Sequence, residues 1–568
     1  MIGNKEDICI NTPLPPTPVS QENDSAQTSL RLGIILCLII TAIYAPSLNA
    51  PFLVNWDDGA FILNNPQMEW TWENAKYYLS HPYQNLYTPT PMLSLMADKA
   101  VFNNHPFGYR FHNLGAHILA ALILFAILRK LRVPPWGAFF GALLWAIHPQ
   151  RVESVCWIVE RKDLACALFG SLAVYCFLIG RDAKRPWLWQ LLAVLAAFIS
   201  LGGKPASAAL PGIFLLLAYA LDHGDWQHIA KDVTIPAIGS FLAVLFVIFM
   251  TKQDNSGQFE TRFFVIAHNL GWYPVTALLP WPPLNPIYPA IRGWGEALPW
   301  LFGGLVLAVA ILLLAYKVHR HWAPGIIAIL LVGGTMLPVL GLLRYTDFDY
   351  CDRYNHIVSM VLWGSLTVLF GKTLLEGRSR RLGMALLTVL ALAEGMTTLF
   401  YHQTVWQSDD ALAIYCLTRP GEPNLKALEL GLTTGCSHAS PNLLLATAKA
   451  YQDYPELQMV DGKEVPADLR NLISWSLVAH ANFLMDNRKD ASPLLALVEE
   501  YLEPAAQQSF SMHYLAEFLY RDLAAIAADR RDKDAALHYL EMEAKYLPPN
   551  PDHPATKQNR FLRERLAE

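Results

Sequence analysis

Two adjacent acids, Asp57 and Asp58, stand in the segment FLVNWDDGAFILNNPQ, shortly after a long apolar stretch. Neighbouring side chains lie about 100° apart on a helix and on opposite faces of a strand, so adjacent carboxylates do not point at one atom. The pair therefore fits one reactive carboxylate and one supporting partner. A carboxylate that faces an apolar site has a raised pKa and makes a competent general base. The alternative is a solvated Asp-Asp-Gly turn, which Gly59 would permit.

The segment HPQRVESVCWIVERKD, residues 148–163, places many charges between two apolar segments. Opposite charges four residues apart on a helix form ion pairs. Here the residues four positions after the charges from Arg151 to Lys162 are Val, Trp, Leu, Ala and Cys. The charges are therefore solvated, pair with other segments or bind a ligand. Pro149 fits a helix start, where anions are favoured. The charged and histidine residues are His148, Arg151, Glu153, Glu160, Arg161, Lys162 and Asp163.

Three other segments combine polar and charged residues beside apolar stretches. They are GGKPAS with Lys204, CDRYNH with Asp352, Arg353, Tyr354 and His356, and YRFHN with Arg110 and His112. Each alone is explained by basic side chains that anchor a helix end at the membrane boundary. Together with the acidic pair they predict another arrangement. In it, Arg and Lys hold a phosphate at the lipid boundary, and a carboxylate faces the group attached to that phosphate.

The composition indicates a membrane protein. Of 568 residues, 53% are hydrophobic and only 16% are charged, whereas about a quarter are charged in ordinary soluble proteins. The net charge of −5 is small and does not suggest a nucleic-acid partner. Residues 1–29 are polar and rich in Pro and Ser, which predicts a disordered cytoplasmic tail.

A helix needs roughly 20 apolar residues to cross a bilayer. On this basis we predict an all-α, polytopic membrane domain over residues 30–402, with about eleven transmembrane helices. The predicted spans are 31–49, 112–129, 136–150, 164–180, 187–202, 206–221, 234–251, 297–316, 323–341, 356–373 and 382–401. The segment 263–280 is also apolar, but its His, Asn, Gly and two Pro residues favour an interfacial or re-entrant element.

Basic residues in the short loops set the predicted orientation. Lys and Arg follow the second, fourth, eighth and tenth spans, as at Arg129, Arg181, Lys317 and Lys372. These alternate loops share one side, which the excess of positive charge makes cytoplasmic. The N-terminus is then cytoplasmic, in an inner membrane. The outward-facing parts are 50–111 (the first outer loop), 151–163, 252–296, 342–355 and the region from about 402.

Residues 403–568 have the charge and helical periodicity of a separate soluble domain. ALHYLEMEAKYLPPNPDH, 536–553, is similar to the second helix of a tetratricopeptide repeat (TPR) with its closing proline. DDALAIYCLTRPGEPN, 409–424, has a similar outline. Because the 34-residue period is not clean between them, we predict a degenerate, TPR-like helical domain outside the cytoplasm.

The charged segments resemble, in order across residues 50–430, the bacterial relatives of the TMTC proteins. Those are glycosyltransferases of the GT-C class with transmembrane helices and TPRs. The resemblance is carried by WDDGAFILNNP, YTPTPMLSLMADKAVFNNHPFGYRFHNLGAHIL, LLWAIHPQRVESVCWIVERKDLACALF, GGKPASAALPGIFLLLAYAL and CDRYNHI. Two positions depart from the family: Thr90 stands where relatives often have Arg, and Arg151 where they often have His.

The resemblance implies a GT-C fold and transfer of a sugar from a polyprenyl-phosphate carrier to an extracytoplasmic acceptor, with protein hydroxyls as the expected acceptor. It implies that Asp57 is the catalytic base and Asp58 its support. The expected donor-phosphate ligands are Arg151, Arg161, Lys162, Lys204 and Arg353. The other residues expected on the site face are His148, Glu153, Glu160, Asp163, Arg110, His112, Asp352 and Tyr354.

Some GT-C enzymes use a divalent cation, Mg²⁺ or Mn²⁺, and others do not; Asp57 and Asp58 alone are too few ligands to predict a metal. Two other functions stay open. One is transfer to a glycan or lipid head group, as in aminoarabinose-type GT-C enzymes. The other is an inactive membrane scaffold whose TPR-like domain recruits partners. A transporter is disfavoured, because the charges lie at span ends rather than near the midplane.

Overall fold

A computed structural model describes residues 19–84, 86–222, 224–250, 262–341, 348–418 and 425–438, and, further on, parts of 440–464 and 520–528 together with 532–547, 551 and 554–567. The chain divides into two compact units, Met1–Ser408 and Asp409–Glu568. The first unit holds the membrane helices, and the charged segments identified above all lie in it.

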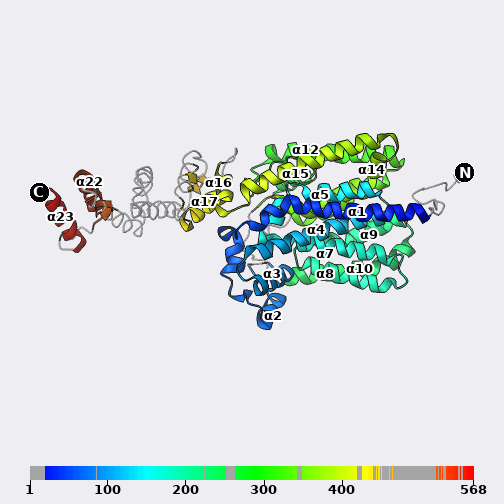
Figure 1. Ribbon diagram of the computed structural model, residues 1–568, viewed down its shortest axis with the longest axis horizontal. Helices are drawn as coiled ribbons and strands as arrows, with labels where there is room; N and C mark the ends of the chain where they lie inside the picture. Colours follow the sequence, from blue (N-terminus) through cyan, green and yellow to red (C-terminus); the bar gives the residue numbers. More distant parts are fainter. Residues whose placement is uncertain are drawn as a thin grey trace. The chain divides into compact units, whose positions relative to one another are not determined.

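The first unit is a bundle of helices that run side by side (Figure 1). Its apolar helices are α1 (Val19–Tyr44), α4 (Pro106–Lys130), α5 (Pro135–Ile147), α7 (Arg161–Gly180), α8 (Pro186–Leu201), α9 (Leu210–Leu221), α10 (Trp226–Met250), α12 (Trp294–His319), α13 (Ala323–Met336), α14 (Asn355–Leu375) and α15 (Arg380–Val405). Within the described residues, seven apolar helices are long enough to cross a membrane and four are shorter. Each predicted span coincides with one of these, so the all-α, multi-pass membrane architecture is confirmed, while the count of eleven crossings stays a prediction.

The outer helices present apolar side chains to their surroundings. Along α15 the exposed fractions of large apolar side chains are near or above 60% at Leu382, Leu386, Val389, Leu392, Met396 and Phe400. A continuous apolar face of this size is explained by lipid rather than water. By contrast, α5 is buried over most of its length and packs against α1, α4, α14 and α15. This central helix brings the surrounding helices together.

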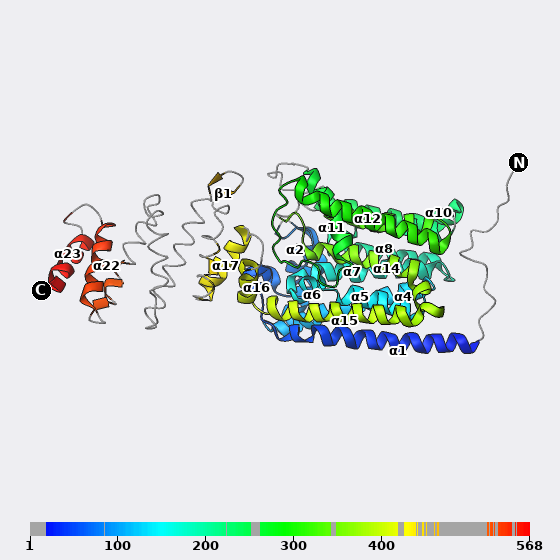
Figure 2. The ribbon, with the colours of Figure 1, turned by 90° about the horizontal axis from the view of Figure 1, so that it is seen from above.

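Shorter elements gather at the end of the bundle remote from the start of α1, where Figures 1 and 2 show α2, α3 and α6. Helices α2 (Trp72–Ser80), α3 (Pro89–Phe102) and α6 (Arg151–Cys156) lie there, with the π-helix η2 (Val54–Leu63) and the 3₁₀ turn η4 (Ile158–Glu160). The remaining 3₁₀ turns of this unit are η1 (Ala45–Asn49), η3 (Pro66–Met68), η5 (Pro205–Ala209), η6 (Leu337–Val339), η7 (Asp352–Tyr354) and η8 (Gly377–Ser379).

The predicted basic loops meet near the start of α1. Arg129, at the end of α4, donates hydrogen bonds to Ser25 and Ser29 of α1. Lys130 forms an ion pair with Asp182 after α7, with 2.7 Å between Nζ and Oδ2. The loops after α4 and α7 therefore share one end of the bundle with the beginning of α1, as alternate loops on one membrane side require.

Two sequence expectations differ from the structure in extent. Helix α1 begins at Val19, inside the predicted tail of residues 1–29, because no proline follows Pro18 to interrupt it; residues 1–18 lie outside the described part. The segment 263–280 contains α11 (Phe263–Thr276), a 14-residue helix that packs against α12 and α14. It does not figure among the candidate spans found in the described residues.

The second unit contains helix pairs. Helix α16 (Asp409–Thr418) packs on α17 (Leu425–Ser437), and α22 (Lys533–Ala544) packs on α23 (Pro554–Ala567). The strands β1 (Met459–Val460) and β2 (Lys463–Glu464) form a short antiparallel pair. The helix predicted over 536–553 ends at Ala544, before the prolines at 548, 549 and 551, and a second helix follows.

Candidate functional site

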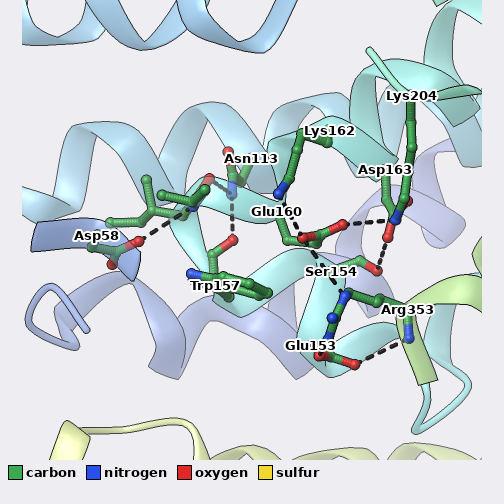
Figure 3. A network of polar contacts seen from close by, with 12 residues as sticks. Asp58, Asn113, Glu153, Ser154, Trp157, Glu160, Lys162, Asp163, Lys204 and Arg353 are labelled. Carbon is green, nitrogen blue, oxygen red and sulfur yellow. Dashed lines mark hydrogen bonds and ion pairs between the residues drawn. The ribbon is translucent and has the colours of Figure 1, made fainter. Parts of the chain in front are cut away.

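Three acids and three bases from five separate segments form one polar network (Figure 3). The acids are Glu153 on α6, Glu160 at the end of η4 and Asp163 on α7. The bases are Lys162 on α7, Lys204 between α8 and η5, and Arg353 in η7. Glu153, Glu160 and Asp163, which lack partners on their own helix, therefore pair with bases from other parts of the chain.

Lys204 lies at the centre of this network. Its Nζ donates hydrogen bonds to Asp163 Oδ1 at 2.6 Å and to Glu160 Oε1 at 2.9 Å. Ser154 Oγ donates to the other oxygen of Asp163 at 3.1 Å. Burial alone would lower the pKa of Lys204, but the Asp163 and Glu160 carboxylates raise it above its usual value. Lys204 is therefore charged at neutral pH.

Arg353 joins the network from a distant part of the sequence. It forms an ion pair with Glu153, and its backbone N–H donates to Glu153 Oε2 at 3.0 Å. Its guanidinium lies 5.6 Å from the ring centre of Trp157 and 5.4 Å from that of Tyr354, within the range of cation–π attraction. Burial raises the pKa of Glu153, although Arg353 opposes this shift.

The accessible groups of the network are its lysines. The side chains of Glu153, Glu160 and Asp163 are at most 2% exposed, whereas those of Lys162 and Lys204 are 12% and 16% exposed. The cationic tips thus lie nearer the surface than the carboxylates that hold them. An incoming phosphate would meet the ammonium groups first, and it accepts hydrogen bonds from them as a carboxylate does.

The acidic pair of the first outer loop lies on η2, which packs against η4. Asp58 is fully buried; its Oδ2 accepts from Leu53 N–H at 2.9 Å and its Oδ1 from Val159 N–H at 3.3 Å. Asp57 is only partly buried. The two residues therefore differ in burial, and Asp58 ties the loop to η4. Gly59 fits this tight turn because a Cβ there would lie 2.5 Å from Val54 O.

Three tryptophans hold η2 in place beside Asp57. The Trp56 ring lies 5.7 Å from that of Trp157 and 6.4 Å from that of Trp406, just beyond α15. In the same π-helix, Phe61 lies 5.5 Å from Lys162 Nζ. Residues four or five apart share a face of a helix with i→i+5 hydrogen bonds, so Asp57 lies on the Phe61 side of η2. This side faces Lys162.

Arg110, His112 and Arg161 form a second cluster, on the α4 side of the site. Arg110 donates to the carbonyl oxygens of residues 50, 51 and 156. Arg161 forms an ion pair with one carboxylate oxygen of Asp98. The other oxygen of Asp98 lies 3.0 Å from His112 Nδ1. Both arginines are nearly inaccessible, so their contacts order the first outer loop, α3 and α4 around the network.

His148 and Asp352 connect the site to the 279–288 segment. His148 Nε2 lies 3.0 Å from Leu279 O, while its Nδ1 accepts from Gln150 N–H. Asp352 Oδ1 accepts from Gln150 Nε2 and from the Tyr288 hydroxyl, both at 3.0 Å. Tyr354, beside Arg353, places its ring 5.1 Å from Lys204 Nζ. Of these residues, Tyr354 alone contacts a base of the network.

Arg151 stands apart from the other expected phosphate ligands. It is fully buried, and its three guanidinium nitrogens have no hydrogen-bond partner among the residues that the structure describes. The departure at Thr90 has a local explanation, since its hydroxyl donates to Ile199 O at 2.7 Å. Thr90 thereby braces the turn that carries Lys204.

A divalent cation fits this site poorly. Within the described part of the chain, no group of three or more His, Cys, Asp or Glu residues is arranged to hold a metal. Both oxygens of Asp58 accept backbone N–H groups, and such donors compete with a cation for the same lone pairs. The chemistry proposed below is therefore derived from the side chains alone.

The sequence also contained contributors to this site that composition and spacing did not single out. Trp157 belongs to the quoted HPQRVESVCW segment, and its aromatic type beside so many charges was the available signal. Asn113 accepts from Arg161 Nε at 2.7 Å. Trp406 and Asp98 carried no signal, because only the packing of α15 and α3 brings them to the site.

The chain is similar to known glycosyltransferases over part of its length. It is 27% identical over 173 residues to protein O-mannosyl-transferase TMTC2 of Homo sapiens, which covers 28% of this chain and 20% of that protein. It is 29% identical over 232 residues to human TMTC1, covering 38% of this chain and 23% of that protein. The chain thus spans about a fifth of the length of these curated relatives. No protein-family model matches it.

One solved structure that the chain matches is that of archaeal oligosaccharyltransferase AglB from Archaeoglobus fulgidus, in complex with an inhibitory peptide and a dolichol-phosphate. It matches 69% of this chain and 58% of its own, with a TM-score of 0.39 and 14% identity. The resemblance expected from the motifs is confirmed by the sequence comparisons: this multi-pass membrane protein is a relative, over part of its length, of the TMTC protein O-mannosyl-transferases.

Proposed function

We propose that the protein is a membrane glycosyltransferase that moves a sugar from a polyprenyl-phosphate carrier to a hydroxyl group outside the cytoplasm. The observation that carries the proposal is the network of Lys162, Lys204 and Arg353 beside the loop that presents Asp57. It combines anion-binding groups with a separate carboxylate at one end of a lipid-facing bundle. The similarity to protein O-mannosyl-transferases supports the same activity and favours a protein acceptor.

The proposed reaction is a single displacement. Asp57 accepts the proton of the acceptor hydroxyl while the hydroxyl oxygen attacks the anomeric carbon of the sugar. The bond between that carbon and the phosphate oxygen breaks, and its electron pair leaves with the polyprenyl phosphate. Negative charge therefore grows on the phosphate during the reaction. Lys162, Lys204 and Arg353 stabilise that charge. Preorganised electrostatic stabilisation of this kind is usually the largest single contribution to the rate enhancement.

The network also explains how three cations are kept in place before the donor binds. Three carboxylates balance them, so the empty site is not a cluster of unpaired charge. Glu160 contacts both lysines, with 3.3 Å to Lys162 Nζ and 2.9 Å to Lys204 Nζ. When the phosphate arrives, it takes the more accessible ammonium groups as partners. Asp58 and the tryptophans hold η2 while this exchange takes place.

The orientation follows the loop charges. The end with the basic loops after α4 and α7 faces the cytoplasm, and the end with η2, α6 and the network faces outward, where a polyprenyl-linked sugar is presented. The N-terminus then lies in the cytoplasm and the second unit outside it, while the helices of the first unit cross an inner membrane. The helix pairs of the second unit support a protein acceptor or partner, because stacked helical repeats form extended binding surfaces.

The test compares intact masses of envelope proteins and profiles of surface glycans in cells that lack this protein. The cells are complemented with wild type, with Asp57→Asn or with an empty vector, at equal expression. A hexose- or pentose-sized mass restored on a protein by wild type alone supports the proposal. Restoration on a glycan or lipid head group moves the acceptor to that class. Full restoration by Asp57→Asn removes Asp57 as the base, and no difference among the three favours the scaffold.

A further inference from the structure

Arg151 belongs to a group of buried polar side chains at the C-terminal end of α5. Helix α5 has 13 residues, so it is about 20 Å long, less than the roughly 30 Å of bilayer hydrocarbon. Its last carbonyl groups are covered by side chains of neighbouring helices. Tyr44 and His117 reach the oxygen of residue 146 at 3.2 and 2.9 Å, and Thr398 donates to that of residue 147 at 2.6 Å.

Four side chains of this group have buried polar atoms without a hydrogen-bond partner among the described residues. The atoms are the three guanidinium nitrogens of Arg151, both carboxylate oxygens of Glu394, both ring nitrogens of His356 and Nδ1 of His117. All four residues are completely buried. Leaving charged groups unpaired inside a protein is costly, so native structures provide a partner from the protein or from ordered water.

These side chains lie close together at the end of α5. The His117 ring lies 5.6 Å from that of Tyr44 and 5.8 Å from that of His356. Gly395, next to Glu394, packs against the side chain of Ile147 at the end of α5. Arg151 stands on α6 and Glu394 on α15, and these two helices pack against each other. The group therefore brings together α1, α4, α6, α14 and α15 around the end of α5.

We propose that Arg151, Glu394, His117 and His356 enclose a small group of ordered water molecules that bridges the Arg151 guanidinium to the Glu394 carboxylate. An internal water makes about three hydrogen bonds, so about three waters would satisfy these atoms. A larger ligand has no path, because the side chains that line the place are closed to solvent.

The hydrated pair gives Arg151 a positioning role, which rests on the proposed function. Arg151 and Glu153 are two residues apart on α6 and so point in different directions. Helix α6 packs against α15, on which Glu394 stands, while Glu153 on the same α6 forms an ion pair with Arg353. Water-bridged attachment of α6 to α15 therefore sets the place of Glu153 and, through it, of the Arg353 guanidinium that meets the donor phosphate.

The water group is tested first on wild-type protein in lipid nanodiscs by X-ray footprinting, which oxidises side chains next to bound water even when bulk solvent does not reach them. Tyr44, His117 and His356 should be oxidised several times faster than Phe177 and Phe214, which are equally buried in an apolar cluster. Equal rates at all five residues would show that the place is dry and would overturn the proposal.

The bridge itself is tested by Arg151→Met, Glu394→Gln and the double variant. Each single change leaves one buried charge without its counterpart, so each should lower the midpoint of thermal unfolding, and the double variant should lose less than the sum of both. Arg381→Met and Glu376→Gln, at exposed positions near the start of α15, serve as matched controls without effect. Strictly additive losses would overturn the bridge.

The positioning role is tested by kinetics with a synthetic polyprenyl-phosphate sugar. Glu394→Gln should raise the KM for the donor about tenfold, while the KM for the acceptor is retained. Loss of folded protein alone would lower only the apparent kcat. An unchanged donor KM would overturn the positioning role. If wild type itself transfers no sugar, the proposed function fails, while footprinting and unfolding still decide the hydrated pair.

Discussion

Lys204 Nζ lies 2.6 Å from Asp163 Oδ1. This contact joins the turn after α8 to the first turn of α7. This contact makes one lysine the counterion of a buried acid and an accessible cation of the proposed phosphate site. The two roles are compatible, because an ammonium group has three donors and only two of them are used on Asp163 and Glu160. The third is left for a ligand.

Removing this cation should destabilise the membrane domain. Lys204→Met leaves Asp163 and Glu160 buried without their shared counterion, which should lower the free energy of unfolding by about 3–5 kcal/mol. Denaturant or thermal unfolding in nanodiscs measures this change. Lys204→Arg should recover part of the loss, and Lys184→Met, at an exposed position, should have no effect. A fully stable Lys204→Met variant would contradict the central place of Lys204.

Asp57 and Asp58 should respond differently to the same substitution. Asp58→Asn replaces one acceptor oxygen by an NH₂ group, which cannot accept from Leu53 or Val159 N–H. It should cost about 1–3 kcal/mol of stability. Asp57→Asn should act mainly on the reaction and lower the transfer rate by about 10²–10⁴-fold, the usual contribution of a general base. Unfolding and initial rates on the same preparations separate the two, and the reverse pattern would exchange their roles.

The π-helical turn should depend on Gly59. In Gly59→Ala the new Cβ would meet Val54 O at 2.5 Å, and the backbone of η2 must shift. We expect a loss of about 1–3 kcal/mol of stability and a fall in transfer rate, because Asp57 moves with η2. Gly115→Ala is the matched control, since nothing lies within 4 Å of a Cβ there. Equal activity of the two variants would argue against the role of this turn.

Acid should weaken the fold through His148. Burial, with a smaller effect of Arg151, lowers the pKa of His148 to about 3, and its bonds to Gln150 N–H and Leu279 O suit the neutral ring. The unfolded chain binds a proton near pH 6.5 while the folded chain does not. His148 therefore makes its full contribution to the free energy of unfolding above pH 6.5. This contribution falls by about 1.4 kcal/mol per pH unit as the pH decreases towards 3.

The measurement is the free energy of unfolding of wild type and of His148→Gln at pH 7.5, 6 and 5. The variant should lose less stability between these pH values than wild type does. His321→Gln, at an exposed position, should retain the wild-type slope. Identical slopes for all three proteins would show that His148 does not titrate with folding.

Several features were predictable from the sequence because they are local. Length and apolar composition identify each membrane helix, and they did so for α1, α4, α7, α10, α12, α14 and α15. The divergence of Asp57 from Asp58 follows from adjacency alone. The spacing of charges in 148–163 showed that their partners must come from elsewhere. These properties belong to a few consecutive residues and need no knowledge of which helices touch.

The partners themselves were decided by the tertiary structure. Arg353 meets Glu153 across 200 positions of sequence, and Trp406 reaches Trp56 only because α15 ends beside η2. Arg151 and Arg353 are the same residue type and both were expected on the donor phosphate. The packing of α6 among α4, α7, α15 and η7 buries Arg151 completely, which its type and spacing could not indicate. Residue type and spacing determine which charges need partners; the order in which helices pack determines which partner each one receives.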